Sequence, residues 1–302
     1  MARENTIRLY GYVKHPPLIG RDANGKKTYV MASVVVIRGP RKVGDHKKYA
    51  KKDCPILLTS DEDLMDQMEQ WKEHSIVDIK GVVSTRNINK GHRCKHCGSP
   101  NFTPGVFTYI TPIFVRLDDH KCESLDECIE YIQQNREISN EAKITGTVCI
   151  GPKKTRPKEG LVVTQYTIAV NRKYRVRTDS AEIESDYPVV KSYGKNALED
   201  RKRLHVGSLI QVDGCIQTRR VEREVTCKNC GKKYMREDTA LELVPFDVEY
   251  LRDYYSDEII EEMKATKTED AMAKIFGPAE TGTEEDTLTE EDYEAGFDDD
   301  VD

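Results

Sequence analysis

Two cysteine pairs are the residues of this chain best suited to chemistry. CKHCG at Cys94–Gly98 and CKNCG at Cys227–Gly231 lie 133 positions apart, and each is a Cys-x-x-Cys pair followed by glycine. Two thiolates at this spacing can bind one metal ion, and structural zinc is usually held by four protein ligands in a tetrahedron. Each pair therefore provides half of a structural zinc site. The simplest complete site places Cys94, Cys97, Cys227 and Cys230 on one ion.

Other completions of the metal site stay open from the sequence. His92 or His96 could join the first pair, Cys122 or Cys128 could contribute, or two chains could share an ion. The chain has nine cysteines and no signal peptide, which favours reduced thiols and metal over a disulfide framework. A redox role is disfavoured because both pairs are predicted on loops between strands and not at the start of a helix.

The elements that must position these cysteines repeat at the same offset. SIVDIKGVVSTR (Ser75–Arg86) aligns with SLIQVDGCIQTR (Ser208–Arg219), and the serine, glycine, threonine and final arginine coincide. Apolar residues alternate between these identical positions, as expected for a strand. We infer that the chain contains two copies of one module, each of which sends a strand into a cysteine loop.

Each copy predicts the order strand, strand, strand, helix, strand, strand, which is that of an OB-fold, a five-stranded Greek-key barrel. The first copy has strands at Thr6–Val13, Tyr29–Arg38, Cys54–Ser60, Ser75–Arg86 and Phe107–Leu117, with a helix at Asp61–His74. The second has strands at Ala142–Ile150, Thr164–Tyr174, Tyr187–Tyr193, Ser208–Arg219 and Thr239–Leu251, with a helix at Asn196–Val206. Gly11 and Gly146 interrupt the opening strands and predict a bend or bulge in each.

The predicted fold is therefore mainly β: two tandem OB-fold barrels with short helices and a disordered acidic C-terminal tail. We expect a first module at 1–138 that includes a linking helix at Ser124–Glu137, with Ser124 as its N-cap. A second module is expected at 139–255. Residues 256–302 are expected to hold a helical segment, Ser256–Thr266, and the tail.

Charge along the chain points to a polyanionic partner. The net charge is −6, but residues 280–302 contain 12 acidic and no basic residues, so the remaining body carries about +6. A basic body with an acidic tail suits a nucleic acid as partner, whereas a plain solubilising tail is the alternative. No apolar run of about 18 residues exists, so we expect a cytoplasmic protein, in a bacterium or a phage-infected host, that does not enter membranes.

Basic and aromatic side chains alternate in the second module, as single-strand binding requires: cations contact phosphates and flat rings stack on bases. We expect Tyr187 in the barrel core, with its hydroxyl at the rim. The candidate nucleic-acid-binding residues of this module are Arg172, Lys173, Tyr174, Arg175, Arg177, Tyr193, Lys195, Arg219, Arg220, Lys153, Lys154 and Arg156.

The first module offers a second set of cations around RKVGDHKKYAKK, the segment expected between its second and third strands. A solvated lysine-rich loop is the simpler interpretation, but lysines at this density also suit contact with phosphates, without reading base sequence. The candidates of this module are Arg38, Arg41, Lys42, Lys47, Lys48, Tyr49 and Arg86.

Three segments of the second module, IAVNRKYRV, DYPVVKSYGKNA and GSLIQVDGCIQTRR, follow one another as in the single-stranded DNA-binding proteins of bacteria and phages. The resemblance covers roughly residues 141–222, and in the first module only the opening strand and Ser75–Arg86. It implies an OB-fold whose barrel faces single-stranded DNA. The acidic C-terminus also resembles the family's tail, which implies recruitment of replication or recombination proteins.

The chain departs from that family in three respects: it has two barrels, it carries cysteine loops, and it ends FDDDVD instead of placing a hydrophobic residue after the acids. These departures suggest a phage or mobile-element version. No phosphate-binding loop, catalytic triad or carboxylate cluster is present in the body, so we expect no enzyme activity. We predict sequence-nonspecific binding of single-stranded DNA in replication, recombination and repair, with structural zinc. Alternatives are an RNA-binding OB protein and a protein scaffold of a replication complex; a homo-oligomer is compatible with all three.

Overall fold

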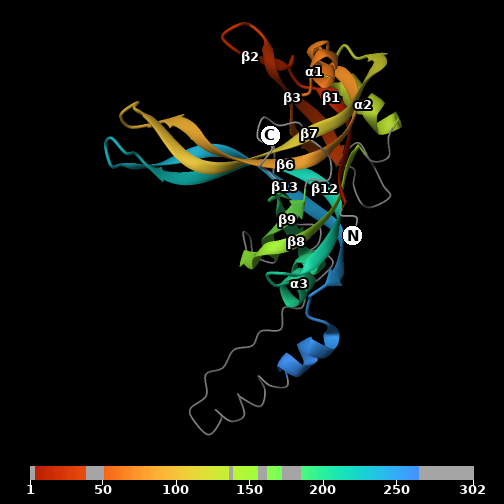
Figure 1. Ribbon diagram of the computed structural model, residues 1–302, viewed down its shortest axis with the longest axis vertical. Helices are drawn as coiled ribbons and strands as arrows, with labels where there is room; N and C mark the ends of the chain where they lie inside the picture. The colour runs from red at the N-terminus through yellow and green to blue at the C-terminus, as the bar shows by residue number, and fades with distance from the viewer. Residues whose placement is uncertain (1–3, 39–50, 136–138, 156–161, 172–184, 265–302) are drawn as a thin grey trace.

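The structure, a computed structural model, describes residues 4–38, 51–135, 139–155, 162–171 and 185–264. Two β-barrels lie one above the other along the longest axis of the molecule, and two long hairpins leave the junction between them on one side (Figure 1). Within the described ranges, no helix is long and apolar enough to cross a membrane.

The first barrel is closed by five strands in the spatial order β1, β6, β7, β5, β3, with β3 returning to β1. The contact between β5 and β7 is parallel and the others are antiparallel. Its elements are β1 (Asn5–Val13), β2 (Leu18–Arg21), β3 (Lys27–Arg38), β4 (Lys51–Asp53), β5 (Ile56–Thr59), α1 (Glu62–Glu69), β6 (Ser75–Arg93) and β7 (Pro100–Lys121). This arrangement is the predicted five-stranded barrel, with β2 and β4 added beside β3.

The second barrel repeats the arrangement, with β8, β12, β13, β11 and β9 in a closed ring. The elements after β7 include α2 (Leu125–Asn135), β8 (Asn140–Thr155), β9 (Val163–Asn171), β10 (Ser185–Asp186), β11 (Val189–Tyr193), α3 (Gly194–Arg203), β12 (Leu209–Thr226) and β13 (Lys233–Arg252), and a short helix follows at residues 257–264. The prediction of two tandem OB-folds is confirmed. The division at residues 138 and 255 stays a proposal, and the predicted tail lies outside the described residues.

Local sequence signals explain some features of these elements and not others. The amide of Glu127 donates to Ser124 Oγ at 3.3 Å, as expected for the N-cap of α2. A Cβ atom at Gly11 would lie 2.2 Å from the carbonyl oxygen of Val35, so only glycine permits this approach between β1 and β3. The predicted helix Asp61–His74 is too long, because α1 ends at Glu69 and a turn follows in which the amide of Lys72 donates to Ser75 Oγ.

The two barrels share one sheet because β1 pairs with β8 in antiparallel register, Ile7 opposite Ala142. The side chain of Asn5 bonds both backbone groups of Val83, at 3.2 and 3.0 Å, and Asn140 does the same for Ile216, at 2.7 and 2.9 Å. The main apolar core contains residues of both barrels. The modules therefore form one packed body with an approximate internal twofold symmetry.

Two buried aspartates bond across this junction in a reciprocal way. Asp53 of the first module accepts the amide of Thr218 at 2.7 Å, and Asp186 of the second accepts the amide of Thr85 at 2.6 Å. Both aspartates are fully buried. Asp53 also pairs with Arg38, although burial raises the pKa of its carboxyl more than Arg38 and Thr218 lower it. An aspartate of each module thus bonds the backbone of the strand that continues into the hairpin of the other module, β12 at Thr218 and β6 at Thr85.

A third buried aspartate, Asp200 of α3, organises the interior of the second barrel. It accepts hydroxyl hydrogen bonds from Tyr166 at 3.0 Å, Tyr250 at 2.8 Å and Ser192. Burial raises the pKa of this carboxyl to about 6, even though the three hydroxyls lower it. The unfolded chain would release this proton near the usual pKa of about 3.9.

We expect Asp200 to make the second barrel less stable as pH rises from about 4 to about 6, because the folded state holds a proton that the unfolded state has lost. The loss should reach up to about 3 kcal/mol and be complete above pH 6. Urea unfolding of the wild type and of Asp200→Asn at pH 4 and pH 7 measures it, since the asparagine variant cannot titrate. The same pH dependence in both proteins would contradict this assignment.

Candidate metal centre and nucleic-acid surface

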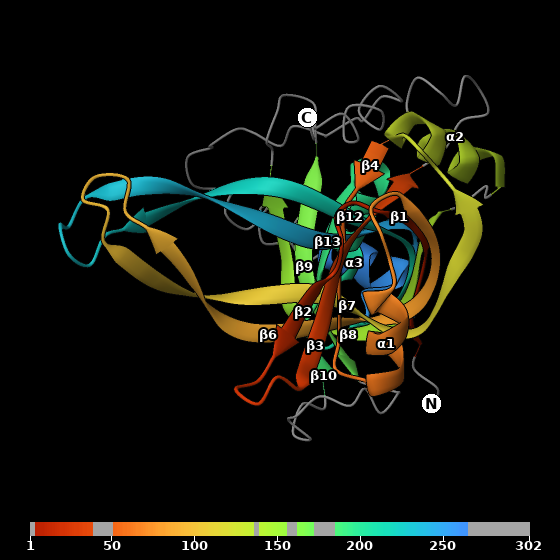
Figure 2. The ribbon, with the colours of Figure 1, turned by 90° about the horizontal axis from the view of Figure 1, so that it is seen from above.

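The two hairpins β6–β7 and β12–β13 run side by side away from the body in both views (Figures 1 and 2). We call residues 86–107 the first hairpin, residues 219–239 the second hairpin, and the two together the arm. The registers Arg93 opposite Pro100 and Thr226 opposite Lys233 place the two cysteine loops at the tip. The predicted strands Ser75–Arg86 and Ser208–Arg219 are thus shorter than those observed, since pairing continues to the loops.

Four thiols meet at the tip of the arm. The Sγ atoms of Cys94 and Cys230 are 3.8 Å apart, and those of Cys97 and Cys227 are 3.7 Å apart. All four Sγ atoms lie within 4.8 Å of one another. A zinc–sulfur bond of about 2.3 Å in a tetrahedron requires sulfur atoms about 3.8 Å apart. The four cysteines can therefore hold one metal ion shared by the two hairpins.

Each cysteine loop has the local geometry that aims two sulfurs at one point. Gly98 and Gly231 have φ values of 72° and 69°, which glycine adopts without strain. Their amides donate to the carbonyls of Cys94 and Cys227 at 2.9 and 3.0 Å. The amides of His96 and Asn229 point at the first sulfur of their pair, each at 3.4 Å. The two loops, which differ only at His96 and Asn229, thus form the same type of turn.

Hydrogen bonds lower the pKa of Cys97 and of Cys227. A hydrogen bond from the backbone of Lys232 also acts to lower the pKa of Cys230, but burial and the neighbouring thiols outweigh it and raise that pKa to about 11. Asn101 donates to Cys227 Sγ at 3.4 Å and accepts the amide of Lys228 at 3.0 Å, so one side chain joins the two loops. Hydrogen bonds from Ser99 lower the pKa of Cys97 to about 6. A thiolate, not a thiol, binds a metal ion.

The local completions of the site are not supported by the geometry. His92 Nδ1 lies 2.6 Å from the hydroxyl of Tyr234, and His96 Nε2 lies 3.2 Å from the carbonyl of Lys233. Cys122 groups with His120 and Glu127 near α2 instead of with the tip thiols. Among the residues that the structure describes, the cluster at the tip comprises the four cysteines alone.

Ion pairs hold the two hairpins together between the tip and the body. Lys90 Nζ lies 2.7 Å from Asp238, and Arg236 donates to Thr103 Oγ1 and to Asp238, both at 2.9 Å. Burial raises the pKa of the Asp238 carboxyl, but hydrogen bonding and charge from Lys90 and Arg236 outweigh it and hold the pKa below its usual range. We call the side of each hairpin that makes these contacts its inner face.

The candidate nucleic-acid residues fall into three groups. Five lie exposed on the described surface: Lys153, Lys154, Lys195, Arg220 and Arg86. Three are bonded to other side chains of the protein. Arg38 is 10% exposed and paired with Asp53, Tyr193 is buried with its hydroxyl 3.3 Å from Gln217, and Arg219 forms two 3.0 Å bonds with Glu242.

The remaining candidates lie outside the described residues: Arg41, Lys42, Lys47, Lys48, Tyr49, Arg156, Arg172, Lys173, Tyr174, Arg175 and Arg177. All of the candidates stay predictions as nucleic-acid contacts.

Two exposed aromatic residues were not identified as contacts from the sequence. The expectation that Tyr187 is buried is wrong, because its side chain is 51% exposed. Phe102, on the first hairpin, is 58% exposed. The alternation of the β7 strand could have indicated Phe102, since Asn101 and Thr103 on either side of it face the other hairpin.

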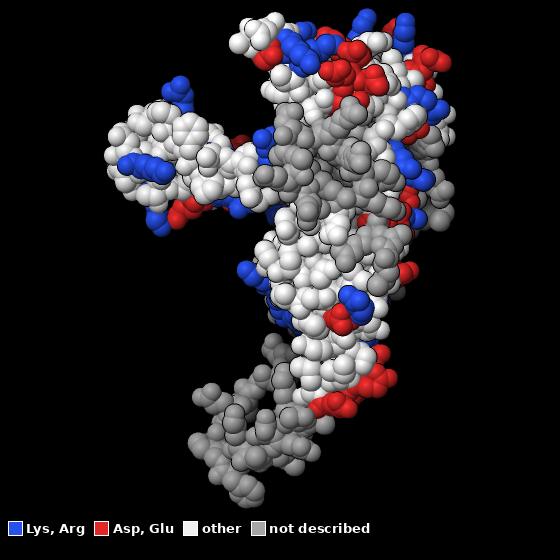
Figure 3. Space-filling view, in the orientation of Figure 1, with Lys and Arg blue, Asp and Glu red and all other residues white. Residues whose placement is uncertain are grey.

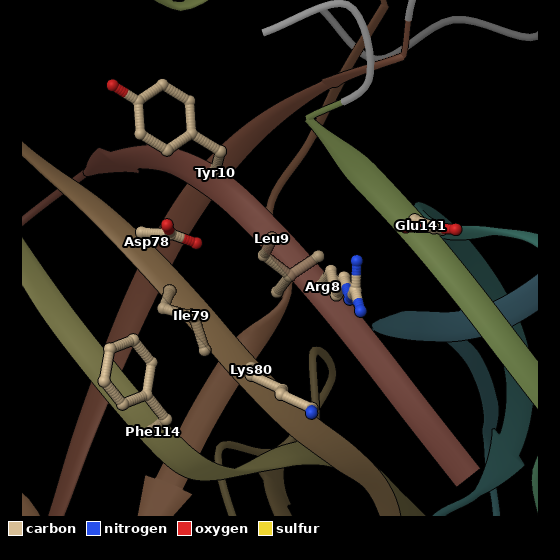
Figure 4. Close-up of a pocket in the computed structure, with 8 residues that line it drawn as sticks. All are labelled: Arg8, Leu9, Tyr10, Asp78, Ile79, Lys80, Phe114 and Glu141. Atoms are coloured by element: carbon tan, nitrogen blue, oxygen red, sulfur yellow. The ribbon is translucent and has the colours of Figure 1, made fainter. Parts of the chain in front are cut away.

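A shallow pocket of about 280 Å³ lies on the outer surface of the shared sheet (Figure 4). Arg8 and Lys80 line it together with Asp78, Glu141 and Phe114. Carboxylates beside the two cations make this surface a poor site for a polyanion. The exposed candidate cations lie elsewhere on the molecule.

The chain is similar in sequence to known proteins. Residues 139–240 match the single-strand binding protein family. The chain is 31% identical over 97 residues to a single-stranded DNA-binding protein of Aquifex aeolicus, which covers 32% of this chain and 62% of that protein. It is 34% identical over 85 residues to single-stranded DNA-binding protein B of Bacillus subtilis, which covers 28% of this chain and 74% of that one. The match thus spans less than two thirds of the Aquifex protein.

The likeness in fold extends over both barrels. The crystal structure of the wild-type single-stranded DNA-binding protein from Thermus aquaticus superposes with a TM-score of 0.55 at 11% identity, covering 93% of this chain and 98% of that one. The sequence matches are confined to part of the chain, whereas this fold match covers nearly all of it. The match to the Bacillus protein is 34% identical and covers 74% of that protein. The chain therefore belongs to the single-strand binding protein family.

Proposed function

We propose that this chain binds single-stranded DNA without sequence preference and without catalysis. The observation that carries the proposal is the match of the second barrel to a family whose members are named for single-stranded DNA binding. Exposed cations on that barrel, among them Lys153 and Lys195, suit contact with a phosphate backbone. Two barrels in one chain would offer two such surfaces.

We further propose that the tip of the arm holds one structural zinc ion. The support is the donor set, four cysteine sulfurs at the spacing of a tetrahedral site. Bound zinc would supply no reaction here; it would join Cys94 and Cys97 of the first hairpin to Cys227 and Cys230 of the second. A tip fixed in this way keeps the inner faces of the hairpins in register.

The biological setting that we propose is replication, recombination and repair of DNA in the cytoplasm. The family membership supports it, and the acidic residues 280–302 are proposed to recruit partner proteins. Self-association of the chain and an origin in a phage or mobile element are further proposals that rest on the sequence.

The binding proposal is tested by titrating the protein with fluorescent oligonucleotides. We expect single-stranded DNA to bind more tightly than duplex DNA of the same sequence, with little dependence on sequence. The affinity should fall steeply as salt rises, because bound cations release counterions from the strand. Replacing Arg172, Lys173 and Arg175 together by alanine should weaken binding to all sequences alike, by about tenfold or more at low salt.

A matched control replaces Lys72, Lys121 and Lys264, three exposed lysines outside the candidate set, and changes the net charge equally. It should reduce affinity much less than the candidate triple. Equal competition by duplex DNA would contradict the proposal, and preference for RNA over DNA of the same sequence would favour the RNA-binding alternative.

A further inference from the structure

The two hairpins of the arm have different outer faces. Strand register places three cross-strand pairs on the outer face of the first hairpin: Asn87 with Val106, Asn89 with Pro104, and Gly91 with Phe102. The corresponding pairs on the second hairpin are Arg220 with Thr239, Glu222 with Glu237, and Glu224 with Met235. All of these residues are exposed. The duplication therefore produced one uncharged outer face and one charged outer face.

The uncharged outer face offers groups that suit nucleobases. Phe102 is 58% exposed, and its ring lies over Gly91, where an added Cβ would come within 3.2 Å of it. Val106 is 50% exposed, and an open groove of about 480 Å³ is lined by Asn87, Asn89, Pro104 and neighbouring residues. An exposed aromatic ring can stack on any base, and asparagine carboxamides can bond base edges.

Charge around this face favours a polyanion over other partners. Residues 86–107 contain four basic residues and no aspartate or glutamate. Arg93, which is on the same side of β6 as Asn89 and Gly91, is exposed, and so is Lys95 at the tip. The outer face of the second hairpin, in contrast, exposes three glutamates, Glu222, Glu224 and Glu237, against one arginine, Arg220. Figure 3 shows the side of the arm toward the viewer as largely free of charged side chains, with scattered Lys and Arg and some Asp or Glu along its lower edge.

A second aromatic residue stands at the base of the same face. The amide of Tyr187 donates to Thr85 Oγ1 at 2.9 Å, and Thr85 lies two positions before Asn87 on β6. The side chain of Tyr187 is 51% exposed. At the matching place on the second hairpin, the amide of Cys54 donates to Thr218 Oγ1 at 2.7 Å. An aromatic ring therefore continues the first outer face toward the second barrel, and a cysteine takes its place at the second hairpin.

We infer that the outer face of the first hairpin, with Tyr187 at its base, is a track on which bases of a single strand stack after it leaves the second barrel. Arg93, on the same side of β6 as Asn89 and Gly91, and Lys95 at the tip would contact its phosphates. The carboxylates on the outer face of the second hairpin would disfavour the strand there. This inference rests on the proposed function, which it deepens by naming where the strand runs.

The equivalent positions Phe102 and Met235 provide a matched test. Phe102→Ala should weaken binding of an oligonucleotide of about 40 nucleotides by about fivefold or more, the effect of one lost stacking contact. Met235→Ala, which removes an exposed side chain at the same place on the other hairpin, should change it by less than about twofold. An oligonucleotide of about 10 nucleotides, long enough for one barrel, should bind both variants as it binds the wild type.

Two further readouts separate stacking from general effects. Phe102→Ala should leave the dependence of affinity on salt unchanged, because it removes no phosphate contact. Asn89→Glu should weaken binding of the long oligonucleotide, whereas Glu222→Gln on the other hairpin should not. Unchanged metal content and melting temperature of each variant would show that the arm remains intact.

The outcomes distinguish the inference from the proposed function. Absence of single-strand binding by the wild type would overturn both. Wild-type binding together with equal effects of Phe102→Ala and Met235→Ala on the long oligonucleotide would overturn the track alone. Unchanged binding of the long oligonucleotide by Asn89→Glu would also overturn the track alone.

Discussion

Replacing Cys227 and Cys230 together by serine is expected to remove all of the bound zinc, not half of it. The two Sγ–Sγ distances of 3.8 and 3.7 Å each join one hairpin to the other, so every ligand set spans both hairpins. Cys94→Ser with Cys97→Ser should therefore give the same complete loss. Metal analysis by mass spectrometry should find one zinc per chain in the wild type and none in either double variant.

Cys122→Ser is the control, because Cys122 lies near α2 and outside the tip cluster. It should keep one zinc. Both barrels should stay folded in the metal-free variants, since their apolar core lies away from the tip. Hydrogen exchange should accelerate at the tip and along the inner faces of the hairpins. Two zinc ions in the wild type, with one retained in each double variant, would show that each loop completes its own site.

Replacing Asp53 by alanine is expected to destabilise the whole body by about 3–5 kcal/mol. Asp53 is fully buried, so its loss leaves Arg38 without a counterion and the Thr218 amide without its 2.7 Å acceptor. Asp53→Asn keeps an oxygen for Thr218 and should cost less. Because Trp71 is the single tryptophan and is buried in the first barrel, its fluorescence reports on that module during urea unfolding.

Asp22→Ala provides the comparison, because Asp22 accepts amides within an exposed turn. It should cost less than about 1 kcal/mol. If the barrels unfold as one unit, the Trp71 transition and the loss of strand signal by circular dichroism should coincide in all variants. Stability equal to the wild type in Asp53→Ala would contradict the role of this aspartate at the junction.

Local patterns in the sequence were sufficient for the strands, the OB-fold and the cysteine loops. Alternation places each strand, and Gly11 is required by the close approach of β1 to β3. The two Cys-x-x-Cys-Gly loops could be paired because the strands before them repeat at one offset. The grouping of the four cysteines was predicted from that repeat and from the preference of zinc for four ligands.

The remaining features depend on contacts between distant segments, which leave no local signal. Thr85 and Thr218 were visible as repeated residues, but the aspartates that bond them come from the other module. Tyr187 alternates like a core residue, yet its position beside β6 exposes it. The ion pairs of Arg38 with Asp53 and of Arg219 with Glu242 likewise join residues that are distant in the sequence, so the sequence did not indicate them.

The ladder between β1 and β8 is made within one chain, and this changes how the assembly responds to dilution. Two separate barrels would meet at a rate set by their concentration and would come apart when scarce. Joined in one polypeptide, the barrels face each other at an effective concentration in the millimolar range or above, whatever the number of molecules present. A few copies of the chain therefore suffice for a complete pair of barrels and a complete arm.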